Sequence, residues 1–170
     1  MIIRRATIED ARNLSALAIQ VWLHAHAKQG INSGIAGYVF TELGEENLTR
    51  QIKDQDKTIL VAYQDKFLVA YAILNLRSTC PDAPMIQTEL TTFYVQEHCT
   101  HKGIGSGLFA ECLKRSINDS GKPALWLAIS TKNNPAVDFC RKQGMILLGF
   151  SNFELGTERH ESYLLASGDL

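Results

Sequence analysis

The stretch THKGIGSG, residues 100–107, decides the fold of this 170-residue chain, because it places three glycines at the expected start of a helix. Glycine lets backbone N–H groups come close to a ligand, and the first N–H groups of a helix have no partner within it. The helix dipole adds a partial positive charge there. A phosphate or diphosphate is therefore the ligand that this stretch favours, although a glycine-rich turn also occurs without one.

Two common nucleotide-binding motifs do not fit this stretch. A Rossmann fingerprint needs its glycines directly after a strand, whereas the polar residues 96–102 separate Gly103 from the strand before it. A Walker loop needs Gly-Lys followed by Ser or Thr, and the Gly121-Lys122 pair is followed by Pro123. A dinucleotide fold and an ATP-binding P-loop are both disfavoured.

The rest of the chain alternates between strand and helix signals. Apolar and β-branched runs predict strands at residues 2–5, 58–63, 67–76, 86–95, 124–129, 146–155 and 161–166. Helix signals begin after Thr7, end before the glycines of 30–37, and recur at 41–54, 103–121 and 135–144. This order predicts an α/β fold with a mixed sheet and helices on both faces. No repeat or linker divides residues 1–170, so we expect a single domain.

Several local signals refine this prediction. Thr7 with Asp10 is typical of a helix start, and Gly144 is typical of a left-handed helix end. The polar residues 64–66 predict a hairpin turn that lacks the usual glycine. The strand at 124–129 is apolar throughout, so we expect it to be fully covered.

Composition excludes several classes of protein. The 17 basic and 18 acidic residues give a net charge of −1, which argues against a nucleic-acid binder. No run of about 20 apolar residues is present, so we expect no membrane span. The four cysteines, Cys80, Cys99, Cys112 and Cys140, form no C-x-x-C pair, so we expect neither a metal site nor a disulfide framework. A reducing cytoplasm is the expected compartment.

Three segments together resemble one known family. They are the strand ELTTFYV at 89–95, the loop THKGIG at 100–105, and the later NNPAVDFC at 133–140. Together they look like the GNAT superfamily of N-acetyltransferases, whose element order also matches. The resemblance implies a mostly antiparallel central sheet of about seven strands, an enzyme, and acetyl-CoA as its co-substrate. The family loop usually begins with Gln or Arg, and Thr100 stands at that position.

The resemblance also implies which residues bind acetyl-CoA. The N–H groups from His101 to Ser106 would hold the diphosphate, helped by side-chain donors from Thr100, His101 and Lys102. The backbone of Phe93 and Val95, on either side of Tyr94, would pair with the pantetheine arm like an added strand. Asn133 matches the family asparagine that reaches this arm, and it is equally well placed to cap the helix that begins near Pro135. The remaining loop residues in this prediction are Gly103, Ile104 and Gly105.

The expected reaction is direct attack of a primary amine on the acetyl thioester. Such an amine, with a pKa near 10.4, is only about 0.1% neutral near pH 7.4, so a base must accept a proton directly or through water. Glu89 stands where some family members carry this base, and apolar neighbours predict its partial burial. The N–H of Val95 would stabilise the developing negative charge. Cys140 replaces the tyrosine that the family often uses as general acid, so it is either a proton donor or a small buried residue, with Tyr94 and Tyr163 as other candidate donors.

The first part of the chain supplies most of the candidate residues for binding the acceptor amine. Aromatic and histidine side chains at 22, 24, 26, 38 and 40 are candidates to line a pocket, and Glu42, Glu45 and Glu46 would suit a cationic, polyamine-like amine. Alternatively, Glu45 and Glu46 are simply the residues that a first helical turn favours, and Trp22 is a core residue. His160 and Tyr163 are further candidates for the same cleft.

Two other functions stay open. The chain is an enzyme for small amines, an enzyme for a protein amine, or a CoA-binding regulatory module without activity. The regulatory module stays open because Thr100 and Cys140 depart from the family pattern. A homodimer is possible for any of these.

Overall fold

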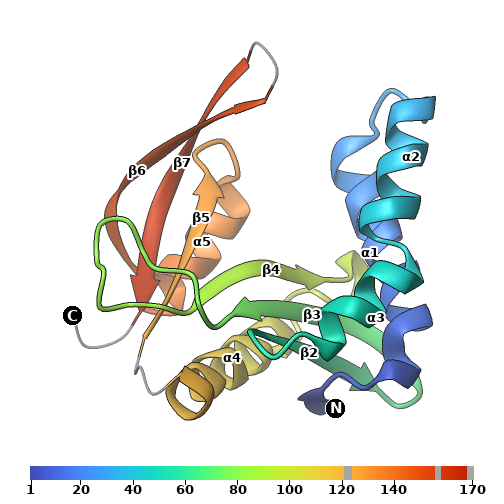
Figure 1. Cartoon of the computed structure of the whole chain (residues 1–170), viewed down its shortest axis with the longest axis horizontal. Coiled ribbons are helices and arrows are strands. Elements are labelled where there is room, and N and C mark those ends of the chain that lie inside the picture. The colour runs from blue at the N-terminus through green and yellow to red at the C-terminus, as the bar shows by residue number, and fades with distance from the viewer. Residues whose placement is uncertain (121–123, 156–157, 168–170) are drawn as a thin grey trace. The chain divides into compact units, whose positions relative to one another are not determined.

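The computed structural model describes the backbone of residues 1–120, 124–155 and 158–167, and the side chains of these residues except 117–120, 153–155 and 158–160. Within this part of the chain, seven strands form one sheet in the order β1-β2-β3-β4-β5-β7-β6 (Figure 1). The strands are β1 (Ile2–Arg5), β2 (Lys57–Gln64), β3 (Phe67–Asn75), β4 (Glu89–Val95), β5 (Leu125–Ser130), β6 (Ile146–Leu155) and β7 (Glu158–Ser167). The predicted fold class, a mixed and mostly antiparallel sheet with helices, is confirmed.

Helices separate most of the strands. They are α1 (Ala11–His26), α2 (Ser33–Glu42), α3 (Glu45–Lys53), α4 (Ile104–Ser120) and α5 (Asn134–Lys142). Two short 3₁₀ turns, η1 (Ile8–Asp10) and η2 (Glu97–Cys99), precede α1 and follow β4. Residues 121–123, where the sequence predicts the end of α4, lie outside the described residues, as do 156 and 157 of the predicted β6–β7 turn.

The chain divides into two compact units. The first contains Met1–Ile73 and Thr92–Leu108, and the second contains Leu74–Thr91 and Phe109–Leu170. Three elements, β3, β4 and α4, contribute residues to both units.

The core of the first unit lies between α1, α3 and the strands β2 and β3. Its buried side chains alternate along the strands and recur every three or four residues on α1, which is the pattern that places them on one face. Each buried leucine stabilises the fold by about 1.5–3 kcal/mol relative to an exposed one. The buried members are Ala6, Leu14, Leu17, Ala18, Leu48, Ile59, Val61, Tyr71 and Ile73.

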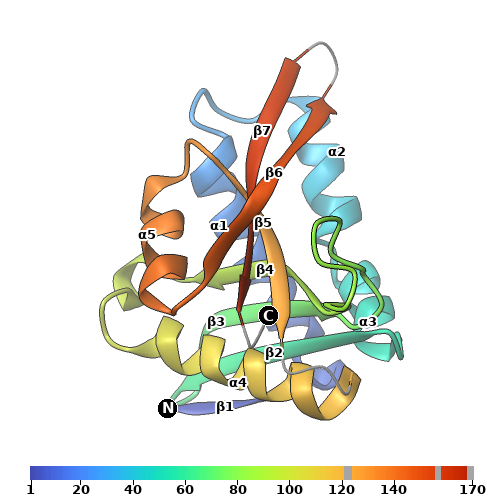
Figure 2. The same ribbon diagram turned by 90° about the vertical axis from the view of Figure 1, so that its left-hand side faces the viewer.

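The second unit is built around a long antiparallel ribbon. In Figure 2, β6 and β7 form a long twisted hairpin, and β7 also pairs with β5 from Leu125↔Ser167 to Ser130↔Ser162. A β-bulge between Leu147 and Gly149 interrupts the β6 register. The core of the second unit contains Cys80, Ala83, Ile86, Ala124, Trp126, Leu164 and Ala166.

The first predicted helix ends before the glycines of 30–37 as expected, but residues 33–42 form a further helix, α2, which the sequence did not predict. Asn32 caps α2, since its side-chain oxygen accepts a hydrogen bond from the N–H of Ile35 at 2.9 Å, and Gly34 and Gly37 lie inside the helix. The predicted helix at 41–54 is in fact split at Gly44. A side chain on Gly44 would overlap the carbonyl of Phe40, so only glycine fits this tight join.

Strand β5 is covered only in part, contrary to expectation. Leu125, Trp126 and Leu127 are buried, whereas Ala128 and Ser130 are exposed. Its parallel pairing with β4 is recorded at Glu89↔Trp126, near the start of both strands. The buried residues of β5, Leu125 to Leu127, are therefore those next to the pairing with β4. The apolar sequence of the strand does not show where this pairing stops.

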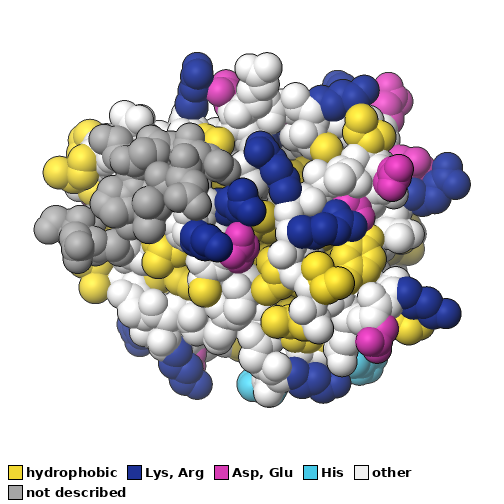
Figure 3. All heavy atoms as spheres, turned by 90° about the horizontal axis from the view of Figure 1, so that it is seen from below, with side chains coloured by type: hydrophobic (Ala, Val, Ile, Leu, Met, Phe, Trp, Pro, Cys, Tyr) yellow, Lys and Arg dark blue, Asp and Glu magenta, His cyan; other side chains and the backbone are white. Residues whose placement is uncertain are grey.

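Other local predictions agree with the structure. The hairpin between β2 and β3 turns at Asp65, which adopts a φ of 54° where glycine is usual. Gly144 ends α5 with a φ of 81°, and the N–H of Met145 returns to the Cys140 carbonyl at 3.1 Å, as in a left-handed helix end. On the face drawn in Figure 3, Lys and Arg side chains are spread among acidic and hydrophobic ones.

Candidate functional site

The loop between β4 and α4 is held in an unusual backbone conformation. Thr100 closes the η2 turn, because its hydroxyl donates to the Glu97 carbonyl at 2.8 Å and its N–H donates to the same oxygen at 3.2 Å. His101 and Gly103 then both adopt positive φ, 59° and 78°. Positive φ is uncommon in residues other than glycine, with histidine among those that adopt it more often, and such positions concentrate at functional sites.

Helix α4 begins immediately after this loop. The N–H of Gly107 donates to the carbonyl of Gly103, the residue before the helix, at 3.0 Å, so Ile104 and Gly105 lie in the first turn, where N–H groups have no partner within a helix. Ile104 is buried and anchors the turn, whereas His101 and Lys102 are exposed. An exposed turn of backbone N–H groups at the start of a 17-residue helix, with a lysine beside it, suits a diphosphate.

The hydroxyl of Thr100, a predicted donor to the ligand, has a hydrogen-bond partner inside the loop. A threonine hydroxyl has a single hydrogen, and here the Glu97 carbonyl accepts it. The residue that replaces the family's Gln or Arg therefore braces the loop from within.

The end of β4 lies next to this loop in the first unit. Phe93, Tyr94 and Val95 are half-buried, and the N–H of Gln96 pairs with the Val69 carbonyl of β3 at 2.8 Å. The Tyr94 ring lies 5.7 Å from the Tyr71 ring, and burial raises the pKa of the Tyr94 phenol. Tyr94 is thereby a weaker proton donor than a free tyrosine.

Glu89 begins β4 and lies in the second unit. Its carboxylate accepts a hydrogen bond of 2.5 Å from the hydroxyl of Ser78, and the Ser78 carbonyl accepts one of 2.7 Å from the indole N–H of Trp126. Sequence reasoning missed Ser78 and Trp126 as neighbours of Glu89. No local signal connects them, because the contacts join residues 11 and 48 positions apart.

Asn133 and Cys140 lie at opposite ends of α5 in the second unit. The Asn133 side-chain oxygen accepts from the N–H of Ala136 at 3.4 Å, a long bond, so its capping role is present but weak. Cys140 is only 4% exposed, and burial raises the pKa of its thiol to about 11. This environment favours the packing role of Cys140 over proton donation.

The expected acceptor residues are grouped around α1 and α2 in the first unit. The Trp22 ring lies 4.8 Å from both the His26 ring and the Tyr38 ring, so Trp22 connects the two helices. The His24 imidazole lies 3.4 Å from the Glu97 carboxylate. Phe40 is 73% exposed and makes no contribution to the core.

The three glutamates of the predicted acidic pocket are not equivalent. Glu45 pairs with the guanidinium of Arg12 at 3.0 Å and begins α3, together with Glu46. Glu42 ends α2 and is exposed, as is Glu46. The pairing of Glu45 leaves Glu42 and Glu46 as the better candidates to face a cation.

A separate groove of about 390 Å³ lies in the first unit. None of the expected acceptor residues lines it. Its lining residues are Asn13, Ala16, Leu17, Gln20, Lys66, Phe67, Leu68 and Gln96.

The structure therefore places the predicted site residues in two groups. The cofactor residues from Phe93 to Ser106 belong to the first unit, whereas Glu89, Asn133 and Cys140 belong to the second, as does half-buried Tyr163. The side chain of His160 lies outside the described residues. In the part of the chain that the structure describes, no cluster of His, Cys, Asp or Glu is suited to a metal ion.

Comparison with known proteins identifies the family. Residues 21–145 match the model of the acetyltransferase (GNAT) family. The chain belongs to this family. As a GNAT protein it is an acetyl-CoA-dependent N-acetyltransferase, and its acceptor is the open question. An uncharacterized N-acetyltransferase of Mycobacterium bovis is 27% identical over 156 residues, which cover 92% of this chain and 96% of that protein. Uncharacterized N-acetyltransferases of Mycobacterium tuberculosis match equally well.

Solved structures show the same GNAT fold. The PaiA N-acetyltransferase of Thermoplasma acidophilum, in complex with coenzyme A, is 22% identical with a TM-score of 0.72, covering 99% of this chain and 98% of that one. The ribosomal-protein-alanine N-acetyltransferase of Brucella melitensis is 19% identical with a TM-score of 0.74, covering 99% of both chains. Among the described residues of this GNAT protein, no helix has the length and hydrophobicity needed to cross a membrane.

Proposed function

We propose that the chain transfers the acetyl group of acetyl-CoA to the primary amine of a small cationic molecule, by direct attack within a complex of both substrates. The observation that carries this proposal is the left-handed turn of His101 and Gly103 at the start of α4, which suits a diphosphate. Acetyl-CoA supplies an acyl group activated as a thioester.

The diphosphate would be held mainly by main-chain groups. The N–H groups from His101 to Ser106 supply the donors in this proposal, and the exposed ammonium of Lys102 adds a positive charge. Phe93 and Val95 would pair with the pantetheine arm through their backbones. The Asn133 side-chain oxygen is already used by Ala136, so its NH₂ group is the part proposed to reach that arm.

Glu89 is the proposed base. Its carboxylate accepts a hydrogen bond from the Ser78 hydroxyl, which holds one carboxylate oxygen in place. In this proposal the amine passes its proton to Glu89 directly or through water, and the N–H of Val95 stabilises the developing negative charge.

Loss of the family tyrosine need not prevent the reaction. A CoA thiolate is a tolerable leaving group, so its departure does not require a strong acid. Cys140 remains a predicted proton donor, and its burial and raised pKa support packing instead.

The acceptor class rests on exposed carboxylates. Glu42 and Glu46 lie at the join between α2 and α3, where a diamine or polyamine would find two negative charges. Exposed Tyr38, on the same helix as Glu42, offers an aromatic surface for the carbon chain of such an amine.

The test is a screen of CoA release with acetyl-CoA and a panel of diamines, polyamines, amino acids, peptide N-termini and lysine peptides. We expect turnover with polyamine-like acceptors, and about a tenfold or larger loss of kcat in Glu89→Gln. Glu161→Gln, an exposed glutamate on β7, is the matched control and should be unchanged. Turnover with peptides alone would move the acceptor to a protein amine, and tight acetyl-CoA binding with no turnover on any acceptor would indicate a regulatory module.

A further inference from the structure

Ser78 is fixed in place by all three of its polar groups. Its N–H donates to the Gln87 carbonyl at 2.9 Å, its carbonyl accepts the Trp126 indole N–H at 2.7 Å, and its hydroxyl donates to the Glu89 carboxylate at 2.5 Å. The three partners lie in different elements: Gln87 in the loop before β4, Trp126 in β5 and Glu89 in β4. A residue held from three directions has little freedom to move its hydroxyl.

The anchors of Ser78 are buried. Trp126 is 7% exposed and belongs to the core of the second unit, together with Cys80 and Ile86. The N–H of Cys80 pairs with the Ile86 carbonyl at 2.9 Å, which continues the pairing that Ser78 begins with Gln87. Because hydrogen bonds are stronger in such a low-dielectric setting, Trp126 and this short ladder give Ser78 a rigid base.

Glu89 has no comparable rigidity of its own. Its side chain is partly exposed, and a glutamate has three rotatable bonds. The Ser78 hydroxyl fixes one carboxylate oxygen, Oε2, and the other oxygen, Oε1, is then the one available to accept a proton. A base that is misplaced by about 1 Å loses roughly 100-fold in rate.

We infer that Ser78 is a positioning residue for Glu89, held in register by the indole of Trp126. This inference rests on the proposed role of Glu89 as base. Ser78 itself exchanges no proton with the substrate. It orients the carboxylate, so its contribution appears in the chemical step and not in the binding of either substrate.

The first test compares Ser78→Ala with Ser78→Thr, which keeps the hydroxyl. We expect Ser78→Ala to lower kcat about tenfold, with the KM of acetyl-CoA and of the amine unchanged within twofold, and Ser78→Thr to recover most of the rate. Thr79→Ala is the control, because Thr79 is the exposed neighbour in the same loop. Thermal melting of each variant separates a loss of folding from a loss of positioning.

The second test is a double-mutant cycle with Glu89→Gln. If Ser78 acts through Glu89, adding Ser78→Ala to Glu89→Gln causes no further loss. Trp126→Phe replaces the indole with a smaller aromatic ring that has no N–H, so it should reproduce part of the Ser78→Ala effect on kcat.

Three outcomes would overturn the inference, and they differ from one another. If Glu89→Gln lowers kcat while Ser78→Ala does not, Ser78 has no positioning role and the proposed base stands. If Ser78→Ala lowers kcat equally in both backgrounds, Ser78 acts independently of Glu89. If Glu89→Gln itself keeps full kcat, the base assignment fails, and the role of Ser78 fails with it.

Discussion

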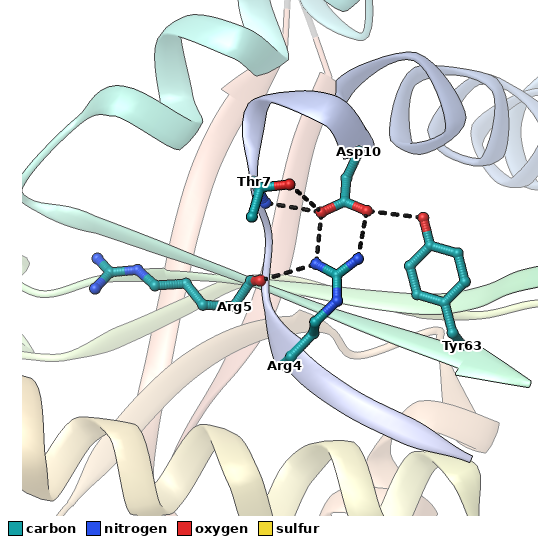
Figure 4. A network of polar contacts seen from close by, with 5 residues as sticks. All are labelled: Arg4, Arg5, Thr7, Asp10 and Tyr63. Atoms are coloured by element: carbon teal, nitrogen blue, oxygen red, sulfur yellow. Dashed lines mark hydrogen bonds and ion pairs between the residues drawn. The ribbon is translucent and has the colours of Figure 1, made fainter.

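Arg4 and Asp10 form a two-pronged ion pair at the start of the fold (Figure 4). The distances are 2.7 Å from Nη1 to Oδ2 and 2.8 Å from Nη2 to Oδ1. The Asp10 carboxylate also accepts the Tyr63 hydroxyl at 2.8 Å and the Thr7 N–H at 2.7 Å. One buried carboxylate thus connects β1, β2 and the turn that begins α1.

Removing the guanidinium should destabilise this junction. Arg4→Met leaves a buried charge at Asp10 without its cation, and we expect a loss of about 2 kcal/mol in the free energy of unfolding, less than for a fully buried pair because Arg4 is partly exposed. Chemical denaturation measures this loss. Arg5→Met is the matched control, because exposed Arg5 makes a single 3.3 Å bond to the Lys57 carbonyl, and its effect should stay within about 0.5 kcal/mol. Equal effects of both substitutions would contradict the importance of the ion pair.

The Asp10 carboxylate should make the free energy of unfolding depend on pH in the acidic range. The hydrogen bond from Arg4 is the main cause that holds the pKa of Asp10 well below its usual value. The stabilisation is therefore complete above the unfolded-state pKa of about 3.9, and it is lost as pH falls from about 5 toward the folded-state value. We expect the unfolding free energy to fall between pH 5 and pH 2, and to fall less steeply in Asp10→Asn. Parallel curves for the two proteins would refute this assignment.

Acetyl-CoA binding should depend on the backbone at positions 101 and 103. Gly103→Ala places a side chain at a φ of 78°, which costs about 1–2 kcal/mol, and we expect a rise of roughly 5- to 30-fold in the KM of acetyl-CoA. His101→Gly keeps the N–H and removes the strain at a φ of 59°, so the KM should stay within twofold. A large increase with His101→Gly would instead show that the imidazole binds the diphosphate.

Gly37, inside α2, and Gly44, at the join between α2 and α3, should respond in opposite ways to alanine. At Gly44 the new side chain would overlap the Phe40 carbonyl, so Gly44→Ala should lower the melting temperature by several degrees. Gly37 lies inside α2 with open space around it, and Gly37→Ala should raise stability by up to about 1 kcal/mol. Differential scanning calorimetry measures both, and a loss at Gly37 would mean that α2 needs its glycine for another reason.

Cys140 should be dispensable for catalysis. Because burial raises the pKa of its thiol to about 11, we expect Cys140→Ala to keep kcat within twofold across the neutral range and to lose only modest stability. Steady-state rates with saturating acetyl-CoA provide the measurement. A tenfold fall in kcat, restored by Cys140→Tyr, would establish the thiol as the proton donor.

The sequence predicted those parts of the fold whose signals are local. The strands at 2–5 and 146–155 were predicted with their observed bounds, and Gly144 ends α5 as expected. Helix α2 was missed because two glycines lower helix propensity. The local cap at Asn32 and the tertiary contact between the Tyr38 and Trp22 rings outweigh that cost.

The features of the candidate site also fall into those with a local sequence signal and those that depend on folding. The loop at 100–106 is visible in the sequence because glycines mark its special backbone. Its bracing by Thr100 is not, because a hydroxyl that bonds to a carbonyl three residues earlier leaves no compositional sign. Ser78 and Trp126 reach Glu89 only through folding, and they were not predicted.

Each compact unit contains one tryptophan, Trp22 in the first and Trp126 in the second. Intrinsic fluorescence can therefore follow the two units separately once either indole is replaced by phenylalanine. Coincident emission changes during denaturation would mark cooperative melting, and separate ones would mark independent melting. This protein thus carries its own pair of optical probes, one beside the aromatic contacts of α1 and α2 and one bonded to Ser78.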